Sequence, residues 1–157
     1  MLPVCQRPGQ GNAGSLRVTR DWATLQAMKT NREAISTKAA PSPAGPYSQA
    51  IAVGEMLHTA GQIPIDPNTG ELVSQDAREQ IDQALRNLDA VLRAGQSSPG
   101  EVVKVTCYLS DLADFGLVNE AFAEFFPQPY PARTCFQAAA LPKGAKVEVE
   151  AIALRSV

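Results

Sequence analysis

A proline, an arginine and a cysteine lie within six residues of one another at 130–135, which read Tyr-Pro-Ala-Arg-Thr-Cys. Pro131 fixes its own φ and biases the preceding residue toward extended backbone, and the apolar stretch 134–139 is typical of a short strand. Arg133 is therefore predicted where a loop enters a sheet. Because a guanidinium binds a carboxylate or phosphate through two parallel hydrogen bonds, we interpret Arg133 as a clamp for the carboxylate of a small metabolite. A surface arginine in an ion pair is the alternative interpretation.

A thiol and two carboxylates are the next candidates. Cys135 lies two residues after Arg133 and would share its face of a strand. No histidine can be assigned to activate this thiol, so a buried structural cysteine is favoured over a covalent mechanism. Glu148 and Glu150 would also share a face, about 6.6 Å apart along a strand. A half-buried glutamate beside a substrate could hold or deprotonate a water; a solvated edge or an ion pair with Lys146 is the alternative.

Three weaker candidates could complete a pocket. Tyr47 follows Gly-Pro and could stack on a ligand, although tyrosine is as often simply packed. Asn119 interrupts the apolar face of a predicted helix, and a buried amide needs partners, either a ligand or a neighbouring loop. Gly61 and Gln62 follow the end of a predicted strand and could present backbone N–H groups to an anion.

Composition restricts the class of protein. The chain has 157 residues, 45% of them hydrophobic, which is enough for one compact domain. No apolar run approaches the ~20 residues of a membrane span. Residues 1–36 contain five Lys/Arg and two Asp/Glu, so of the 14 basic and 16 acidic groups the remaining chain holds 9 and 14, a net charge of −5. This acidic domain argues against nucleic acid as a partner, because phosphate contacts supply most of that affinity.

Cysteine and histidine usage excludes several kinds of site. The three cysteines, Cys5, Cys107 and Cys135, have no CxxC spacing, which favours free thiols in a reducing compartment. His58 is the only histidine, so metal sites that need two imidazoles are excluded. GxSxG and Walker A patterns are also missing. We therefore predict chemistry that runs without the usual metal, nucleotide or histidine machinery.

Residues 1–36 differ from the rest of the chain and are predicted to be an N-terminal extension. They are rich in Pro, Gly and Arg, and their first acidic residue is Asp21. A transit peptide, a leader derived from a vector and a natural disordered tail all fit this composition. A single domain is predicted over residues 37–157. The protein is expected in the cytoplasm, or in mitochondria or plastids if the extension is a transit peptide.

The elements that must position these residues follow from periodicity and turn signals. Gly54 separates two β-prone runs, 48–53 and 55–60, as in a hairpin. Further strands are predicted at 101–109, 134–139 and 146–154, and helices at 76–94 and 114–126. The result is an α+β domain in which two helices cover one face of a sheet. Because the last strand carries apolar residues on both faces, the second face is expected to pack on another subunit.

Finer predictions concern the helix ends and the buried faces. Asp76 and Glu79 resemble a capping box, and Gly95 is predicted to stop the first helix. The strand 101–109 is predicted to bury one face and the second helix one apolar stripe. The predicted face comprises Val103, Val105, Cys107 and Leu109, and the stripe comprises Phe115, Val118, Phe122 and Phe125.

Five motifs together resemble the RidA/YjgF family of reactive-intermediate (enamine/imine) deaminases, often labelled L-PSP endoribonucleases. They are Gly-Pro-Tyr-Ser-Gln-Ala at 45–50, Gly-Gln-Ile-Pro at 61–64, Val-Asn-Glu at 118–120, Pro-Ala-Arg-Thr-Cys at 131–135 and Val-Glu-Val-Glu-Ala-Ile-Ala at 147–153. The resemblance runs from about residue 32 to residue 155. It implies a chorismate-mutase-like mixed sheet with two helices on one face, and a homotrimer with active sites at the subunit interfaces.

The resemblance also implies an activity, 2-iminobutanoate/2-iminopropanoate deamination. Imino and enamine acids such as 2-aminoacrylate would be hydrolysed to 2-oxo acids and ammonia without a cofactor. By position, Arg133 resembles the carboxylate clamp and Glu148 the acid/base that positions water. Tyr47, Gly61, Asn119 and Cys135 resemble substrate-binding residues.

One position departs from the family pattern, and two other functions remain open. The family commonly has serine where this chain has Ala60, so a hydrogen bond worth on the order of 1 kcal/mol could be lost. An altered substrate preference is expected from this change. The alternative functions are an endoribonuclease that inhibits translation, and a non-catalytic trimer that binds 2-oxo acids. The acidic domain argues against the first, and the presence of both Arg133 and Glu148 argues against the second.

Overall fold

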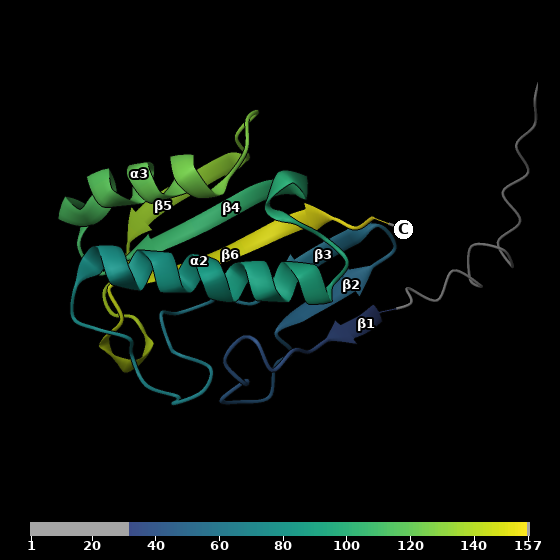
Figure 1. Ribbon diagram of the computed structural model, residues 1–157, viewed down its shortest axis with the longest axis horizontal. Helices are drawn as coiled ribbons and strands as arrows, with labels where there is room; N and C mark the ends of the chain where they lie inside the picture. Colours follow the sequence, from purple (N-terminus) through teal and green to yellow (C-terminus); the bar gives the residue numbers. More distant parts are fainter. Residues whose placement is uncertain (1–31, 157) are drawn as a thin grey trace, which may run out of the picture.

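The computed structural model describes residues 32–156, which form one mixed sheet with two helices against one of its faces (Figure 1). The strands are β1 Arg32–Ile35, β2 Ala50–Val53, β3 Met56–Thr59, β4 Val102–Leu109, β5 Ala132–Gln137 and β6 Val147–Leu154; the helices are α2 Ala77–Ala94 and α3 Phe115–Phe125. Three short 3-10 turns occupy Pro99–Glu101, Leu112–Asp114 and Pro142–Gly144. The predicted α+β architecture is confirmed. No helix in this part of the chain is long and apolar enough to cross a membrane.

The strands are ordered β1-β2-β3-β6-β4-β5 across the sheet. Every neighbouring pair is antiparallel except β4 and β5, which are parallel because α3 carries the chain back between them. β6 lies between β3 and β4, so the last strand of the chain joins the hairpin to the βαβ unit. Both helices lie on one side of the sheet, and the other side is uncovered over the described residues (Figure 1).

The folded sheet begins inside the segment predicted to be an extension. β1 pairs with β2, with Ile35 opposite Ala50, and both of these side chains are buried. Four residues of the predicted extension are therefore part of the domain. The remainder of that prediction falls on residues 1–31, which lie outside the described residues.

Helix α2 begins as predicted and ends for a different reason. The Asp76 side chain accepts a hydrogen bond from the Glu79 amide at 2.9 Å, which caps the first turn. Gly95 follows the helix with φ −84°, whereas the left-handed residue is Gln96 at φ 62°. Position 95 requires a glycine because a Cβ there would lie 2.5 Å from Leu57 Cδ2. Close packing against β3, and not a left-handed conformation, requires this glycine.

Strand β4 departs from the predicted alternation at its start. The pairing with β6 shifts register between Val102 and Lys104, as a β-bulge does. Val102 is consequently buried, with 8% of its surface exposed, while Val103 is 48% exposed. The prediction that Val103 shares the buried face is wrong because the bulge inverts the pattern at this point. From Val105 onward the predicted alternation holds, with Val105, Cys107 and Leu109 buried beneath the helices.

Candidate functional site

Arg133 is the second residue of β5, and its side chain lies against α3. Arg133 Nη2 donates a hydrogen bond to Asn119 Oδ1 at 2.8 Å. The guanidinium carbon also lies 5.1 Å from the centroid of the Phe115 ring and 5.5 Å from that of Phe122, within the range of cation–π attraction. Arg133 forms no ion pair with any carboxylate in residues 32–156. A fixed cation with unused donors therefore faces solvent beside the helix.

A cavity of about 310 Å³ adjoins this guanidinium. Four of its lining residues, Asn119, Phe122, Ala123 and Phe126, follow the i, i+3, i+4, i+7 spacing of one helix face. The sequence prediction assigned Phe115 to the core, but this residue is exposed because it begins α3 beside Arg133. The aromatic surroundings of the cation were not predicted. The three-residue spacing from Asn119 to Phe122 could have indicated that an aromatic ring lies on the same helix face as the amide.

Cys135 shares the face of Arg133, as predicted. It lies opposite Cys107 in the parallel pairing of β4 and β5 and is half-buried, packed against the core. Cys107 is fully buried and belongs to the core, as predicted. Burial raises the pKa of the Cys107 thiol, and the neighbouring Cys135 raises it further. We name Asn119, Phe122, Arg133 and Cys135 the clamp region.

Glu148 on β6 belongs to a second group of candidates. Its carboxylate lies directly on the backbone of Gly61, so a Cβ at position 61 would overlap the carboxylate oxygen. The loop is held there by two backbone hydrogen bonds between Gln62 and Val149, of 2.8 and 3.1 Å. A cavity of about 360 Å³ is lined by Tyr47, Gly61 and Glu148 together with ten other residues, including Ala60. The Gln62 N–H predicted to be free for an anion is therefore used by the fold.

The electrostatics of Glu148 depend on burial and on its neighbour two residues along the strand. Burial raises the pKa of the Glu148 carboxyl, and the charge of Glu150 raises it further. Glu150 Oε1 accepts a hydrogen bond from the Tyr108 hydroxyl at 2.9 Å. Burial first, and this hydrogen bond second, raise the pKa of Tyr108 to about 12. Glu148 is thus a carboxyl whose proton is held more tightly than usual.

Tyr47 is placed by a loop that a buried glutamine organises. Gln49 is 2% exposed, and its Nε2 donates to the carbonyl oxygen of Pro41 at 2.8 Å and to that of Thr37 at 3.0 Å. The Tyr47 hydroxyl accepts from the Ala44 amide at 3.2 Å, and the side chain remains exposed. The proline-rich segment is therefore fixed from below by Gln49, a role that the sequence reasoning missed. We name Tyr47, Gly61, Glu148 and Glu150 the carboxylate region.

The two regions lie on opposite faces of the sheet. Arg133 is opposite the buried Val105 in the β4–β5 register and contacts α3, which places it on the helix side. Glu148 alternates with the buried Val147 and Val149, which places it on the uncovered side. One chain therefore does not bring Arg133 and Glu148 into a common cavity. Within residues 32–156, no group of three or more His, Cys, Asp or Glu side chains could hold a metal ion.

Comparison with known proteins gives consistent relatives over the described domain. A family model described as Endoribonuclease L-PSP matches residues 37–155. The RutC family protein y4sK of Sinorhizobium fredii is 53% identical over 120 residues, covering 76% of this chain and 95% of its own. The Homo sapiens 2-iminobutanoate/2-iminopropanoate deaminase is 44% identical over 124 residues, covering 79% and 90%. The crystal structure of E. coli TdcF with bound serine is 42% identical, with TM-score 0.75, and covers 79% of this chain and 99% of its own.

Proposed function

The chain belongs to the endoribonuclease L-PSP (RidA/YjgF) family, and on that premise we propose that it hydrolyses reactive 2-imino and enamine acids to 2-oxo acids and ammonia. The observation that carries the proposal is Arg133, a cation fixed by Asn119 and two aromatic rings yet unpaired within residues 32–156. Such a fork suits the carboxylate that every 2-imino acid carries. The human relative, named as a deaminase of 2-iminobutanoate and 2-iminopropanoate, supports this substrate class.

In the proposed reaction the protein mainly positions the substrate and one water molecule. Arg133 holds the carboxylate while Glu148 takes a proton from a water that adds to C2 of the carbon–nitrogen double bond. The proton returns to the nitrogen to give a carbinolamine. Glu148 then transfers the hydroxyl proton to the same nitrogen, the carbon–nitrogen bond breaks, and ammonia leaves as the oxygen becomes a carbonyl. An enamine is first protonated at C3 to give the imine. Because imines are already electrophilic, proximity and proton transfer are sufficient, and no cofactor takes part.

The opposite placement of the two regions supports a site shared between subunits. We propose that the clamp region of one chain meets the carboxylate region of a second chain in a homotrimer. The exposed apolar side chains of the strands, Val103, Phe136 and Leu154, supply surface for such contacts. Tyr47, Gly61 and Cys135 would then line the substrate pocket. Size-exclusion chromatography with light scattering tests the trimer, and a monomer would contradict it.

A coupled assay tests the proposed activity. A serine/threonine dehydratase generates 2-aminoacrylate or 2-aminocrotonate, and the appearance of the 2-oxo acid is followed with wild-type protein, with Arg133→Ala and with Arg93→Ala. Arg93 is an exposed arginine on α2 that pairs only with Asp89 among the described residues, so it serves as the matched control. We expect acceleration by the wild type and by Arg93→Ala, reduced at least about 100-fold in Arg133→Ala, because a charged bidentate contact is lost. Equal rates with and without wild-type protein would overturn the proposal.

A further inference from the structure

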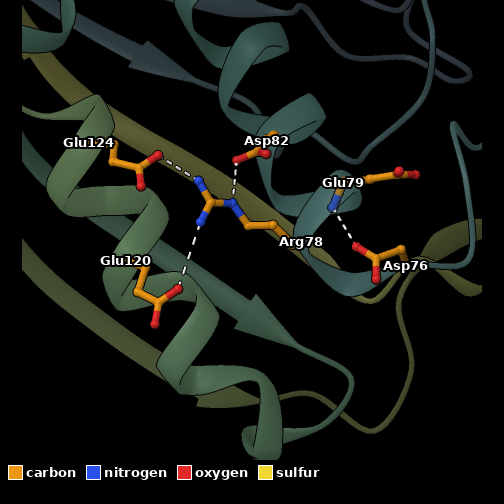
Figure 2. Close-up of polar contacts among 6 residues, drawn as sticks. All are labelled: Asp76, Arg78, Glu79, Asp82, Glu120 and Glu124. Carbon is orange, nitrogen blue, oxygen red and sulfur yellow. Dashed lines mark hydrogen bonds and ion pairs between the residues drawn. The ribbon is translucent and has the colours of Figure 1, made fainter.

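One arginine on α2 connects that helix to α3, the helix that carries Asn119. Arg78 Nη2 lies 2.6 Å from Glu124 Oε2, and Arg78 Nη1 lies 3.8 Å from Glu120 Oε2. Its Nε donates to Asp82 Oδ1 on its own helix at 2.9 Å. Figure 2 shows the guanidinium between these three carboxylates, with α2 on one side and α3 on the other. The hydrogen bonds to Asp82 and then Glu124 raise the pKa of Arg78.

The two flanks of α3 are held by two different arginines. Asn119 and Glu120 are consecutive, so their side chains leave the helix about 100° apart. Asn119 accepts the hydrogen bond from Arg133 at the β5 edge, while Glu120 and Glu124 face Arg78 on α2. Between these flanks the helix buries Val118, Ala121 and Phe122. Because α3 has only 11 residues, its rotation about its own axis is set by few contacts, and the Arg78 pairs are among them.

We propose that Arg78 is a positioning residue: by holding Glu120 and Glu124 it fixes the rotation of α3, so that Asn119 presents the Arg133 guanidinium to the substrate carboxylate. The inference rests on the proposed deaminase function only for its kinetic test. Arg78 does not touch the substrate in this account. Its effect passes through α3 to Asn119 and from there to Arg133.

Loss of the Arg78 guanidinium is expected to produce repulsion between α2 and α3. Without the guanidinium, Asp82, Glu120 and Glu124 would face one another as three carboxylates with no cation between them. Like charges at this spacing repel, and Glu120 and Glu124 are both on α3 while Asp82 is on α2. The repulsion therefore acts between the helices and turns the flank of α3 away from α2. Asn119 moves with that flank, because it is adjacent in the helix.

The test compares Arg78→Met with Arg93→Met. Arg93 is the control because it also pairs with an aspartate four residues away on the same helix, Asp89 at 2.8 Å, and none of the other ion pairs of the described residues involves it. We expect Arg78→Met to raise KM about threefold to fivefold with kcat changed less than twofold, because the clamp binds ground state and transition state alike. Arg93→Met is expected to leave both constants at wild-type values. A loss of folded protein alone would lower kcat and leave KM unchanged.

Rescue variants separate repulsion from general damage. In Arg78→Met/Glu120→Gln/Glu124→Gln the helices no longer repel, so KM is expected to return toward the wild-type value. Arg78→Lys keeps a cation but not the planar fork, and its KM is expected between those of wild type and Arg78→Met; this variant replaces Arg78→Met if the latter does not fold. Equal KM values for Arg78→Met and Arg93→Met would overturn the proposal, as would a triple variant with KM no lower than Arg78→Met.

A binding measurement keeps this inference distinguishable from the proposed function. The dissociation constant of 2-oxobutanoate, a carboxylate that needs no turnover, is measured by calorimetry for the same variants. A protein without deaminase activity that still binds 2-oxobutanoate more weakly after Arg78→Met would overturn the proposed function and retain the positioning role. Active protein whose variants all bind 2-oxobutanoate equally would retain the function and overturn the positioning role.

Discussion

The clamp region carries a cation and the carboxylate region carries acidic groups, and the surroundings of these charges differ. Arg133 is exposed on the helix side, fixed by a neutral amide and two aromatic rings, and it forms no ion pair within residues 32–156. Glu148 is half-buried on the uncovered side, packed on the backbone of Gly61, with its pKa raised by burial and by Glu150. These surroundings suit the two proposed roles, in which Arg133 binds the substrate carboxylate and Glu148 exchanges a proton.

This difference predicts different kinetic signatures for the two regions. A cation that binds the substrate carboxylate equally in ground and transition states acts mainly on KM, whereas a group that moves a proton acts on kcat. Substitutions in the carboxylate region should therefore lower kcat, and mild substitutions in the clamp region should raise KM. A mild clamp-region variant that lowers kcat at unchanged KM, or a carboxylate-region variant that raises KM at unchanged kcat, would contradict this division.

Glu148→Gln is expected to have the largest effect. The amide keeps the shape of the side chain but cannot take a proton from water, so kcat should fall about 100-fold or more, with KM changed little. Steady-state kinetics of the coupled reaction measure both constants. The control is Glu55→Gln, an exposed glutamate in the turn between β2 and β3. A kcat for Glu148→Gln within threefold of wild type would show that Glu148 does not transfer the proton.

Gly61→Ala tests whether the position of the Glu148 carboxylate matters as well as its identity. The new Cβ would overlap the carboxylate and displace it, and a displacement near 1 Å can cost as much as 100-fold in rate. We expect kcat to fall about tenfold to 100-fold. Gly116→Ala is the control, since a Cβ there meets no other atom within 4 Å. Equal kcat values for the two variants would show that the close contact does not orient Glu148.

Asn119→Leu tests the clamp region by removing the hydrogen bond that fixes Arg133. Loss of this neutral acceptor is expected to raise KM about fivefold while kcat stays within about twofold. The affinity for 2-oxobutanoate should weaken by the same factor, which calorimetry measures. A fall in kcat at unchanged KM would contradict the division between the two regions.

Glu150→Gln is expected to move a pH profile without abolishing activity. The charge of Glu150 raises the pKa of Glu148, so its removal lowers that pKa. In the proposed reaction Glu148 acts in its ionised form, so the acidic limb of kcat/KM should shift to lower pH, and the variant should stay active in more acidic buffer than wild type. The glutamine oxygen can still accept from Tyr108, which limits structural change. A limb that is unmoved, or that moves to higher pH, would contradict the coupling.

The same raised pKa has a consequence for stability with a defined sign. Glu148 binds its proton more tightly in the folded state than in the unfolded chain, so ionisation opposes folding. This cost is absent below the unfolded-state pKa and develops as pH rises to the folded-state pKa. Glu148→Gln should therefore melt at a higher temperature than wild type at pH 7, and this difference should disappear near pH 4. Calorimetric melting at the two pH values measures it.

Much of the secondary structure could be predicted because it depends on neighbouring residues. The periodicity of residues 76–94 and the Asp76 cap determine α2, and the glycine at position 54, with φ 58°, determines the hairpin turn. Two predictions were wrong where a distant contact decided the outcome. Val103 turned outward because a bulge shifted the β4–β6 register, and Phe115 stayed exposed beside Arg133.

The sequence by itself determined the candidate groups: a proline that introduces a strand with Arg133, paired glutamates with a two-residue spacing, and too few histidines for a two-imidazole site. Only the tertiary structure decided how these groups are divided. The face of a strand on which a side chain lies depends on register, and the insertion of β6 between β3 and β4 sets that register through residues far apart in sequence. Arg133 and Glu148 consequently lie on opposite faces, because strand alternation fixes relative faces only within one strand, and the sheet fixes them between strands.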